Sequence, residues 1–410
     1  MHTPKRERAP VGRERASWTS DCRHDAFVRE LVAEARGGGT RTAHEKVRVR
    51  EDENLDLNMG SVYCPSTMLR ELSLENPVNR WESTHVEYDD GEVPEAGLRV
   101  FEDDSVEIVS ENDSPDVGFR YGINPYRGCA HGCAYCYARP SHEYLGFGSG
   151  TDFERRIVIK PRAAELLRAR FEKPSWKGDL LVISGNTDCY QPLEARFGLT
   201  RACLAVCAEY RNPVHIITKS ALVERDLDVL LDLHKGSSVS VSVSITFWDE
   251  NVSRAIEPYA PSPRRRVETV RRLASAGIPV IVHVAPLIPG LADKDLIPIL
   301  EAAREAGAVS ALSIPLRLPG STKEVFESRL RRHLPLVAEK VLRRVREMHG
   351  GRLNDPRFFA RMQGEGEYQA TLQRVFDATA RRLGYGQHPE PRLGTFRRPT
   401  DAGGQLRLFG

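Results

Sequence analysis

Between residues 118 and 315, short apolar segments alternate with longer amphipathic ones. The apolar segments are rich in β-branched residues, have the length of strands and lie at 118–125, 179–184, 213–218, 239–246, 278–285 and 308–315. Helical periodicity fills the intervals at 161–172, 198–210, 222–233, 263–276 and 293–306. Right-handed crossovers place such helices over a parallel sheet and curl it, so the pattern predicts an α/β fold, a partial (β/α)6 TIM-like barrel. In such folds the chemistry takes place at the C-terminal ends of the strands.

Composition divides the rest of the chain. A stretch rich in Arg, Glu, Gly and Thr predicts a disordered N-terminal arm, and scattered apolar positions after it predict an irregular N-terminal lead-in. Amphipathic patterns behind the barrel predict a helical C-terminal extension, followed by a Pro- and Gly-rich flexible tail. The expected units are the arm (1–58), the lead-in (59–117), the barrel (118–322), the extension (323–385, with one long or broken helix at 323–349 and another at 367–383) and the tail (386–410).

Composition also limits the functional classes. The 410 residues carry a formal net charge of +2 and are 40% hydrophobic, which suits one large domain with extensions. No apolar run approaches the ~20 residues of a membrane span, and the basic N-terminus has no apolar core of a secretory signal, so we expect a cytoplasmic protein. Arg-rich stretches at 261–272, 329–346 and 381–398 fit either a nucleic-acid-binding face or ordinary solvated helix faces.

Three of the eight cysteines are clustered. Cys129, Cys133 and Cys136 form a C-x3-C-x2-C array directly after the first expected strand. This spacing indicates a metal centre rather than a disulfide framework. Three thiolates can hold three corners of a four-iron cluster, because soft sulfur ligands suit iron–sulfur centres. The alternative is a structural zinc site completed by His131 or His142, for which a second C-x2-C knuckle is missing.

The strings around the cysteines resemble a known superfamily. The array has the spacing of the radical S-adenosylmethionine (SAM) superfamily, and GINPYRGCAHGCAYCYARP, TDCYQPLE and ITKSALVERDLDVL are similar to its branch related to spore photoproduct lyase, the DNA-repair-photolyase-like proteins. The resemblance covers roughly residues 75–385. It implies an enzyme whose [4Fe–4S] cluster leaves one iron open for SAM and supplies the electron that cleaves SAM to a 5′-deoxyadenosyl radical.

The resemblance also implies which residues contact SAM, and these residues follow the ends of successive strands. A small-residue turn after the second strand suits a ligand ammonium, because glycine permits close approach and oxygens accept hydrogen bonds. Each position alone also fits a structural interpretation, such as an Asx-type turn or a solvated lysine. The expected contacts are Tyr135 and Ala285 for the adenine, Ser184, Gly185, Asn186, Thr187 and Asp188 for the amino group, Lys219 for the carboxylate, and Ser244 and Thr246 for the ribose.

One position departs from spore photoproduct lyase. That enzyme resets a thymine lesion in DNA and uses a cysteine on the second strand as a hydrogen donor, where this chain has Gly185. Cys189 and Tyr190 are therefore the candidates for a catalytic role. Cys203 and Cys207 share one face of an expected helix and are expected to pack as small apolar residues.

Three functions are compatible with these observations. The first is a radical SAM enzyme acting on DNA in a repair-type, spore photoproduct lyase-like reaction. The second is a radical SAM enzyme that modifies a peptide, an RNA or a small metabolite. The third is a non-enzymatic iron–sulfur or zinc protein that binds DNA or a partner.

The C-terminal tail suggests a partner. Gln405, Leu406, Leu408 and Phe409 are similar to the short peptide by which bacterial DNA polymerases and repair proteins bind the sliding clamp. An extended tail with two apolar anchors and a glutamine can fill preformed pockets, as other linear motifs do. The resemblance also implies an electron donor such as flavodoxin or ferredoxin.

Overall fold

The computed structural model describes residues 47–48, 76–77 and 97–399. The expected arm over 1–58, apart from the strand β1 (Val47–Arg48), lies outside these residues, as does the clamp-like peptide at 405–409. Within the described part, no helix is both long enough and apolar enough to cross a membrane.

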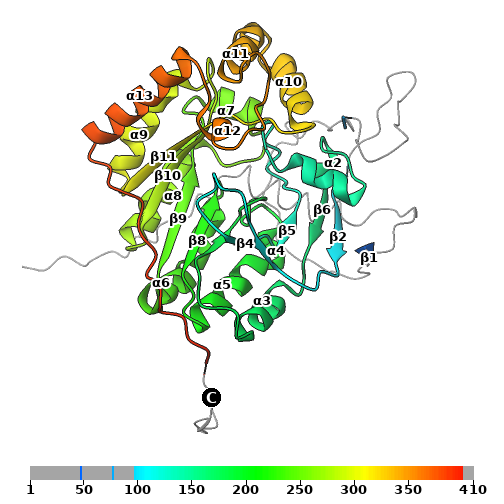
Figure 1. Cartoon of the computed structure of the whole chain (residues 1–410), viewed down its shortest axis with the longest axis vertical. Helices are drawn as coiled ribbons and strands as arrows, with labels where there is room; N and C mark the ends of the chain where they lie inside the picture. Colours follow the sequence, from blue (N-terminus) through cyan, green and yellow to red (C-terminus); the bar gives the residue numbers. More distant parts are fainter. Residues whose placement is uncertain (1–46, 49–75, 78–96, 400–410) are drawn as a thin grey trace, which may run out of the picture.

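A seven-stranded sheet forms the centre of the fold (Figure 1). The strands are, in spatial order, β11 (Ser310–Pro315), β10 (Val280–Leu287), β9 (Val239–Ser244), β8 (Val214–Thr218), β7 (Leu181–Ile183), β4 (Tyr121–Ile123) and β3 (Val109–Glu111). All neighbours pair in parallel except β3, which joins the edge antiparallel to β4. Each parallel strand lies inside a predicted segment or extends at most two residues beyond one of its ends. The predicted partial barrel is therefore confirmed.

Helices cover the outer face of this sheet. They are α3 (Ala163–Glu172), α5 (Leu199–Glu209), α6 (Leu227–Gly236), α8 (Pro263–Ser275) and α9 (Leu296–Glu305), with the 3-10 turns η3 (Ala221–Asp226) and η4 (Asp293–Asp295) before α6 and α9. In α8, Ser262 caps the start with its Oγ accepting from the Arg265 N–H at 3.3 Å, and Val267, Val270 and Leu273 recur on the buried face. These local signals explain why the helix was predicted with nearly the same ends.

The inner face of the sheet is polar. In β9, Val239, Val241 and Val243 belong to the main apolar core, and the serines between them point the other way. Ser242 Oγ lies 3.0 Å from His215 Nε2 on β8 and 2.9 Å from His283 Nε2 on β10. Apolar packing between sheet and helices therefore stabilises the fold, and the concave face is left to polar groups.

A smaller sheet lies beside β4. It contains β1, β2 (Arg99–Asp103), β6 (Arg156–Ile159) and β5 (Tyr126–Arg127), and it is flanked by η2 (Arg139–Leu145), α2 (Asp152–Arg155) and α4 (Glu194–Phe197). Its own apolar cluster includes Leu98, Tyr126 and Ile157. The sequence analysis did not predict these elements, because each is too short to show a period.

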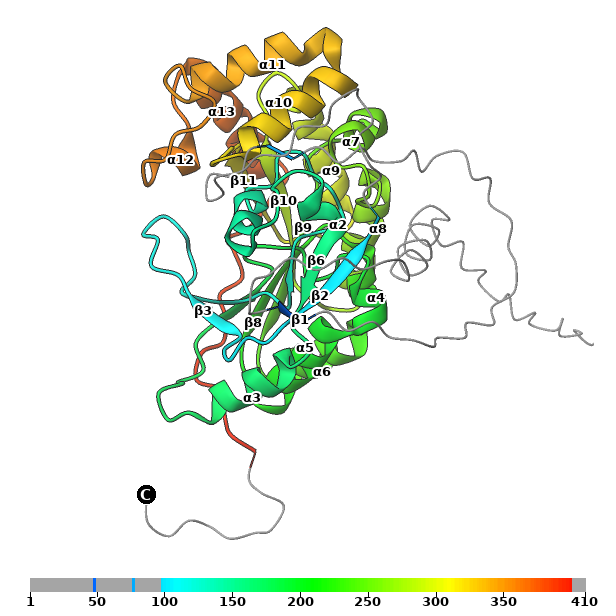
Figure 2. The ribbon, with the colours of Figure 1, turned by 90° about the vertical axis from the view of Figure 1, so that its right-hand side faces the viewer.

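The extension lies at the C-terminal end of the barrel strands. It contains α10 (Thr322–His333) and α11 (Pro335–Met348), which confirm a broken pair, then α12 (Ala360–Gln363) and α13 (Glu367–Arg382); α7 (Glu250–Ile256) contacts α10. Figure 2 shows α10 and α11 at one end of the molecule and α3 at the other.

Residues 386–399 form a segment that we name the C-terminal strap. It crosses the N-terminal ends of the strands: the Gly386 N–H donates to the Val309 carbonyl at 3.0 Å, and the Arg397 N–H donates to the Tyr210 carbonyl at 2.9 Å. Phe396 packs against Tyr210, with ring centroids 6.1 Å apart. These residues are the described part of the predicted flexible tail, and they follow a path over this end of the barrel (Figure 1).

Candidate active site

The cysteines of the motif lie on one loop at the C-terminal edge of the main sheet. Cys129 and Cys133 are buried, Cys136 is half-buried, and all three are free thiols. The loop begins at Gly128, whose φ is +80° and where a Cβ would lie 2.8 Å from the Phe153 carbonyl oxygen, so only glycine fits. The Cys129 N–H donates to the same carbonyl at 2.9 Å, which fixes the first cysteine against α2.

A buried arginine holds the middle of this loop. Arg139 is fully buried and donates to the Cys133 carbonyl at 2.7 Å and to the Gly132 carbonyl at 3.2 Å. Its charge is balanced by Glu154, 2.5 Å away, which also pairs with Arg329 of α10 at 2.6 Å. No sequence pattern indicated these three charged residues, and the local signal for Arg139 is its position directly behind the cysteine array.

The turn after β7 has a constrained backbone. Ser184 has φ +79°, and its Oγ donates to the Thr187 carbonyl at 2.8 Å and accepts from the Cys189 N–H at 2.6 Å. Asn124, another residue that the sequence analysis missed, accepts at Oδ1 from the N–H groups of Asn186 at 2.9 Å and Thr187 at 3.3 Å. The Ser184 side chain therefore maintains the shape of the turn.

Asp188 connects the turn to the next strand. Its carboxylate accepts from the Thr218 hydroxyl at 2.7 Å, the Lys219 N–H at 2.8 Å and the Tyr190 N–H at 2.9 Å, and lies 3.4 Å from His131 Nδ1. Burial alone would raise the pKa of Asp188, but His131 and the other donors lower it to about 2. These contacts fix the Asp188 carboxylate between the turn and the start of the segment after β8.

A buried network links the cysteine loop to two further strand ends. The Tyr135 hydroxyl donates to Glu257 and lies 3.1 Å from Thr246 Oγ1, which donates to the Ala285 carbonyl at 3.1 Å. Glu257 Oε2 is 2.5 Å from Arg266 Nη2, and both side chains are fully buried. Tyr135, Thr246 and Ala285 were expected to lie together from the sequence, and the structure brings them together. The sequence did not indicate Glu257 and Arg266, because Arg-rich helices usually carry their arginines on solvated faces.

Comparison with known proteins identifies the family. The model of the radical SAM superfamily matches residues 123–303. An uncharacterized protein of Mycobacterium tuberculosis is 37% identical over 233 residues, which are 56% of this chain and 67% of that protein. The chain belongs to the radical SAM superfamily. It is therefore an enzyme, and its family implies a [4Fe–4S] cluster and SAM as cofactors.

Two further comparisons agree with this assignment. An uncharacterized protein of Methanocaldococcus jannaschii is 33% identical over 186 residues, which are 45% of this chain and 67% of that protein. A structure of spore photoproduct lyase complexed with dinucleoside spore photoproduct is 18% identical, with a TM-score of 0.51 over 73% of this chain and 84% of that chain. At this identity the likeness shows the shared fold and leaves the reaction of this radical SAM enzyme open.

The donor set of this radical SAM enzyme fits an iron–sulfur cluster. Burial raises the pKa of Cys129 and Cys136, and it raises that of Cys133 to about 12. Buried thiols of this kind ionise when a positively charged metal centre replaces water as the stabilising partner. In the described part of the chain, no three His, Cys, Asp or Glu side chains lie close enough together to hold a single metal ion.

Lys219 fits the carboxylate of the family's cofactor. Its ammonium lies over the Tyr135 ring, 5.6 Å from the centroid, and makes no ion pair with another described residue. Burial alone would lower the pKa of Lys219, but Cys133 and Glu257 raise it above its ordinary value, so the amine is charged. A half-buried cation beside the cysteine loop is matched by an anionic ligand group.

The two catalytic candidates of the sequence analysis are fully buried. Cys189 belongs to the main core, as do Cys203 and Cys207. The Tyr190 hydroxyl donates to Asp226 Oδ2 at 3.1 Å, at the start of α6. Their catalytic role stays a prediction.

Phe119 accounts for the glycine that departs from spore photoproduct lyase. A Cβ at Gly185 would lie 3.2 Å from Phe119 Cζ, so the phenylalanine ring fills the space next to this position. The Gly185 carbonyl accepts from the hydroxyl of Tyr137, the residue directly after Cys136.

The alternative zinc ligands have other surroundings. His142 Nε2 lies 2.8 Å from the Arg156 carbonyl oxygen, and burial lowers the pKa of this imidazole to about 4. His131 is almost fully buried and lies against Asp188.

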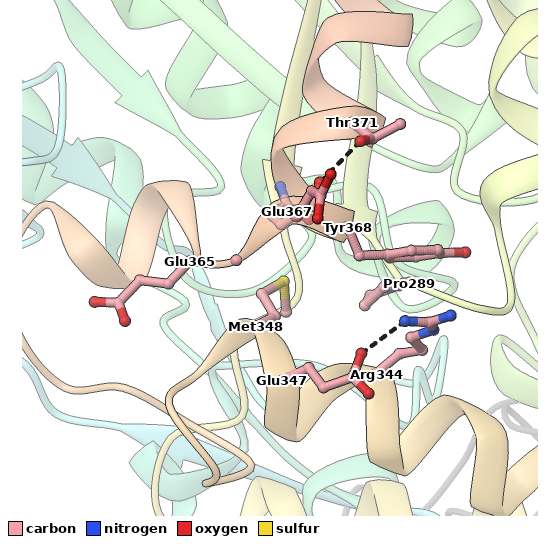
Figure 3. Close-up of a pocket in the computed structure, with 10 residues that line it drawn as sticks. Pro289, Arg344, Glu347, Met348, Glu365, Glu367, Tyr368 and Thr371 are labelled. Atoms are coloured by element: carbon pink, nitrogen blue, oxygen red, sulfur yellow. Dashed lines mark hydrogen bonds and ion pairs between the residues drawn. The ribbon is translucent and has the colours of Figure 1, made fainter.

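A separate cavity of about 430 Å³ lies between α11 and the start of α13 (Figure 3). Arg344 lies 4.0 Å from the centroid of the Tyr368 ring and pairs with Glu347 at 2.7 Å. None of the residues that line this cavity was expected to contact a cofactor, so it is distinct from the cysteine site.

Proposed function

We propose that this radical SAM enzyme holds its cluster on Cys129, Cys133 and Cys136, with SAM bound between Tyr135 and Lys219. When bound there, a reduced cluster would supply the electron for the cleavage of SAM to methionine and a 5′-deoxyadenosyl radical. The observation that carries the proposal is the set of three free thiols on one loop, two of them buried and one half-buried. The half-buried Lys219 ammonium lies beside them and makes no ion pair with another described residue.

The geometry divides the expected SAM contacts into two groups. Ser184, Thr187, Asp188 and Thr246 already use their side chains in bonds within the protein, so we propose that they orient the backbone around the ligand. The free groups make the direct contacts in this proposal. They are the Lys219 ammonium, the Ser244 hydroxyl, which makes no hydrogen bond to another described residue, and backbone groups of Gly185, Asn186 and Ala285.

The buried network around Tyr135 contributes order and exclusion of water. Tyr135 is 5% exposed and Glu257 is 1% exposed. A radical formed beside these groups is shielded from solvent, and the ring orientation is fixed by the hydroxyl bond to Glu257.

We propose DNA as the substrate and a repair-type reaction as the chemistry. Support comes from the sequence strings shared with the spore photoproduct lyase branch and from the shared fold. Gly185 and the Phe119 ring beside it argue for a reaction that differs from spore photoproduct reversal. We propose Cys189 or Tyr190 as a hydrogen donor in place of the missing cysteine; because both are fully buried, this role requires a path to the core, and Cys189→Ala tests it.

Anaerobic reconstitution tests the cluster. The wild-type protein should bind about four iron ions, show the paramagnetic signal of a reduced four-iron cluster and convert SAM to 5′-deoxyadenosine with a reductant. Cys136→Ser should lose all three properties. Cys203→Ala is the matched control, because it removes a buried cysteine outside the array. A protein in which both variants keep the cluster contradicts the proposal.

Irradiated DNA tests the substrate. Ultraviolet-damaged duplex should stimulate 5′-deoxyadenosine formation and lose its lesion, whereas undamaged duplex of the same sequence should do neither. Damaged DNA that is inert in the presence of an active cluster contradicts the DNA proposal and favours the alternative substrates: a peptide, an RNA or a small metabolite.

We propose two partners. The electron donor is a flavodoxin or ferredoxin, and the sliding clamp binds through Gln405, Leu406, Leu408 and Phe409. The position of the strap supports the proposal of clamp binding. Arg398 donates to the Lys173 carbonyl at 2.8 Å, which holds the end of the strap at the opposite end of the barrel from the cysteine loop. Removal of residues 405–410 should abolish clamp binding measured by surface plasmon resonance; unchanged binding contradicts the proposal.

A further inference from the structure

Two adjacent phenylalanines are exposed in the loop that leads into α12. Phe358 is 53% exposed and Phe359 is 55% exposed, although side chains of this size are usually buried. Figure 2 shows α12 on the same side of the molecule as the loop before β4. Tyr137, directly behind the last cysteine of the array, is 48% exposed. Grouped exposed aromatic side chains mark interaction sites.

Hydrogen bonds to Asp116 fix the position of the loop that carries the two phenylalanines. Arg361 makes two bonds to Asp116, at 2.6 and 2.5 Å, and the Phe359 N–H donates to the same carboxylate at 3.0 Å. Phe359 has φ +63°, an uncommon conformation for a non-glycine residue, which this bond helps to fix. The Arg361 guanidinium also lies 4.6 Å from the centroid of the Phe358 ring.

Arg317, which has no carboxylate partner within the described part of the chain, connects α12 to the cysteine loop. Arg317 follows β11 at the C-terminal edge, donates to the sulfur of Met362 in α12 at 3.2 Å and lies 5.9 Å from the centroid of the Tyr137 ring. Among the described residues it makes no ion pair, unlike Arg361, whose charge Asp116 balances. Burial and the charge of Arg361 lower the pKa of Arg317 from its ordinary value.

Two ring–guanidinium contacts thus lie beside the site, Arg317 with Tyr137 and Arg361 with Phe358. We name this set, Tyr137, Arg317, Phe358, Phe359 and Arg361, the aromatic–arginine edge. Ring faces stack on nucleobases of any sequence, and an unpaired guanidinium binds a phosphate oxygen strongly. A peptide without aromatic side chains would use the charge but would offer no ring to stack on the adjacent rings.

We infer that the aromatic–arginine edge binds a locally unpaired strand of DNA next to the reacting nucleotide. Arg317 binds a backbone phosphate, and Phe358 and Phe359 stack on unpaired bases. Tyr137 continues the edge toward the cysteine loop. The inference rests on the proposed action on DNA and assigns the residues that recognise it.

Fluorescence anisotropy with the full-length protein tests this inference without requiring turnover. The probes are a labelled single-stranded 20-mer and the duplex of the same sequence, titrated at several salt concentrations. Arg317→Gln should weaken binding of the single strand about tenfold. It should also make the slope of log affinity against log salt shallower by about 0.7, the value for one phosphate contact on a single strand.

The phenylalanines should show a different signature. Phe358→Ala should weaken binding of the single strand by about 5- to 150-fold, the range for loss of one stacked base, with an unchanged salt slope. Phe358→Leu keeps the apolar volume and should behave like the alanine variant, because an aliphatic group cannot stack. Binding of the duplex should change less than binding of the single strand.

Controls separate failure of the inference from failure of the proposed function. Arg381→Gln removes an exposed charge on α13 and should change neither affinity nor slope. Unchanged melting temperatures show that the variants are folded. If the wild type binds DNA, and both Arg317→Gln and Phe358→Ala bind it as tightly as the wild type does, the inference is wrong and the proposed function stands. If the wild type binds neither probe, the action on DNA is wrong and the inference falls with it.

Discussion

Replacing Arg266 by methionine tests whether a buried ion pair supports the site. Arg266 Nη2 lies 2.5 Å from Glu257 Oε2, both side chains are 0% exposed, and the guanidinium also donates to the carbonyls of Pro261 at 2.8 Å and Ser244 at 3.2 Å. Methionine keeps a comparable apolar length but leaves Glu257 as a buried carboxylate without its guanidinium. Glu257 in turn holds the Tyr135 hydroxyl, so the effect should reach the cysteine loop.

Loss of one partner of a buried ion pair costs about 3–5 kcal/mol of unfolding free energy. At about 2–4 °C per kcal/mol, the melting temperature should fall by about 6–20 °C. Arg264→Met is the matched control on the same helix: Arg264 is 71% exposed and lies 3.5 Å from Glu250, so its loss should cost less than about 1 kcal/mol.

Urea unfolding and calorimetry measure these differences, and pH adds a second check. Burial alone would raise the pKa of Glu257, and Arg266 with Lys219 lowers it below its ordinary value. In Arg266→Met the carboxyl should take up a proton more easily, so the deficit should be larger at pH 8 than at pH 5. Adding Glu257→Gln should restore part of the loss. Equal losses in Arg266→Met and Arg264→Met, or a further loss from Glu257→Gln, would refute the reasoning.

Three further predictions concern other parts of the fold. Burial lowers the pKa of His215 to about 3, so its contribution to stability is lost as pH falls from about 6.5 toward 3; His215→Gln should flatten that part of a stability–pH curve measured by urea unfolding. Arg361 lowers the pKa of Asp116 to about 2, so Asp116→Asn should remove a loss of melting temperature that the wild type shows between about pH 4 and pH 2. Gly185→Ala should lower the free energy of unfolding by about 1 kcal/mol, because the added Cβ would press against the Phe119 ring. Calorimetry should show that Phe119→Leu in the same chain removes most of this loss; if the losses of the two single variants simply add, the contact is contradicted.

Patterns within single segments were readable from the sequence. In α8, a serine cap, a proline at the first turn and apolar residues at helical spacing lie within fourteen consecutive residues, so they predicted the helix directly. The strand β9, with its alternating valines and serines, was predicted in the same way. The cysteine array is also local, and its spacing alone indicated the metal centre that the family implies.

Some of the elements that the sequence did not predict are very short. The strands β5 and β6 have two and four residues, too few to show a period, and they form only by pairing with each other and with β2. Their position beside the cysteine loop depends on this pairing.

The sequence by itself determined the partial barrel, the position of the cysteine array and the strand ends that surround it, because each depends on residues close together along the chain. Only the tertiary structure decided which charges are buried together and which charges make no ion pair with another described residue. Tyr135 meets Glu257 across 122 positions, and Arg317 reaches Met362 across 45 positions. A side chain's partner at such separations depends on how the layers pack, so its role is fixed by three-dimensional contact and not by any spacing in the sequence.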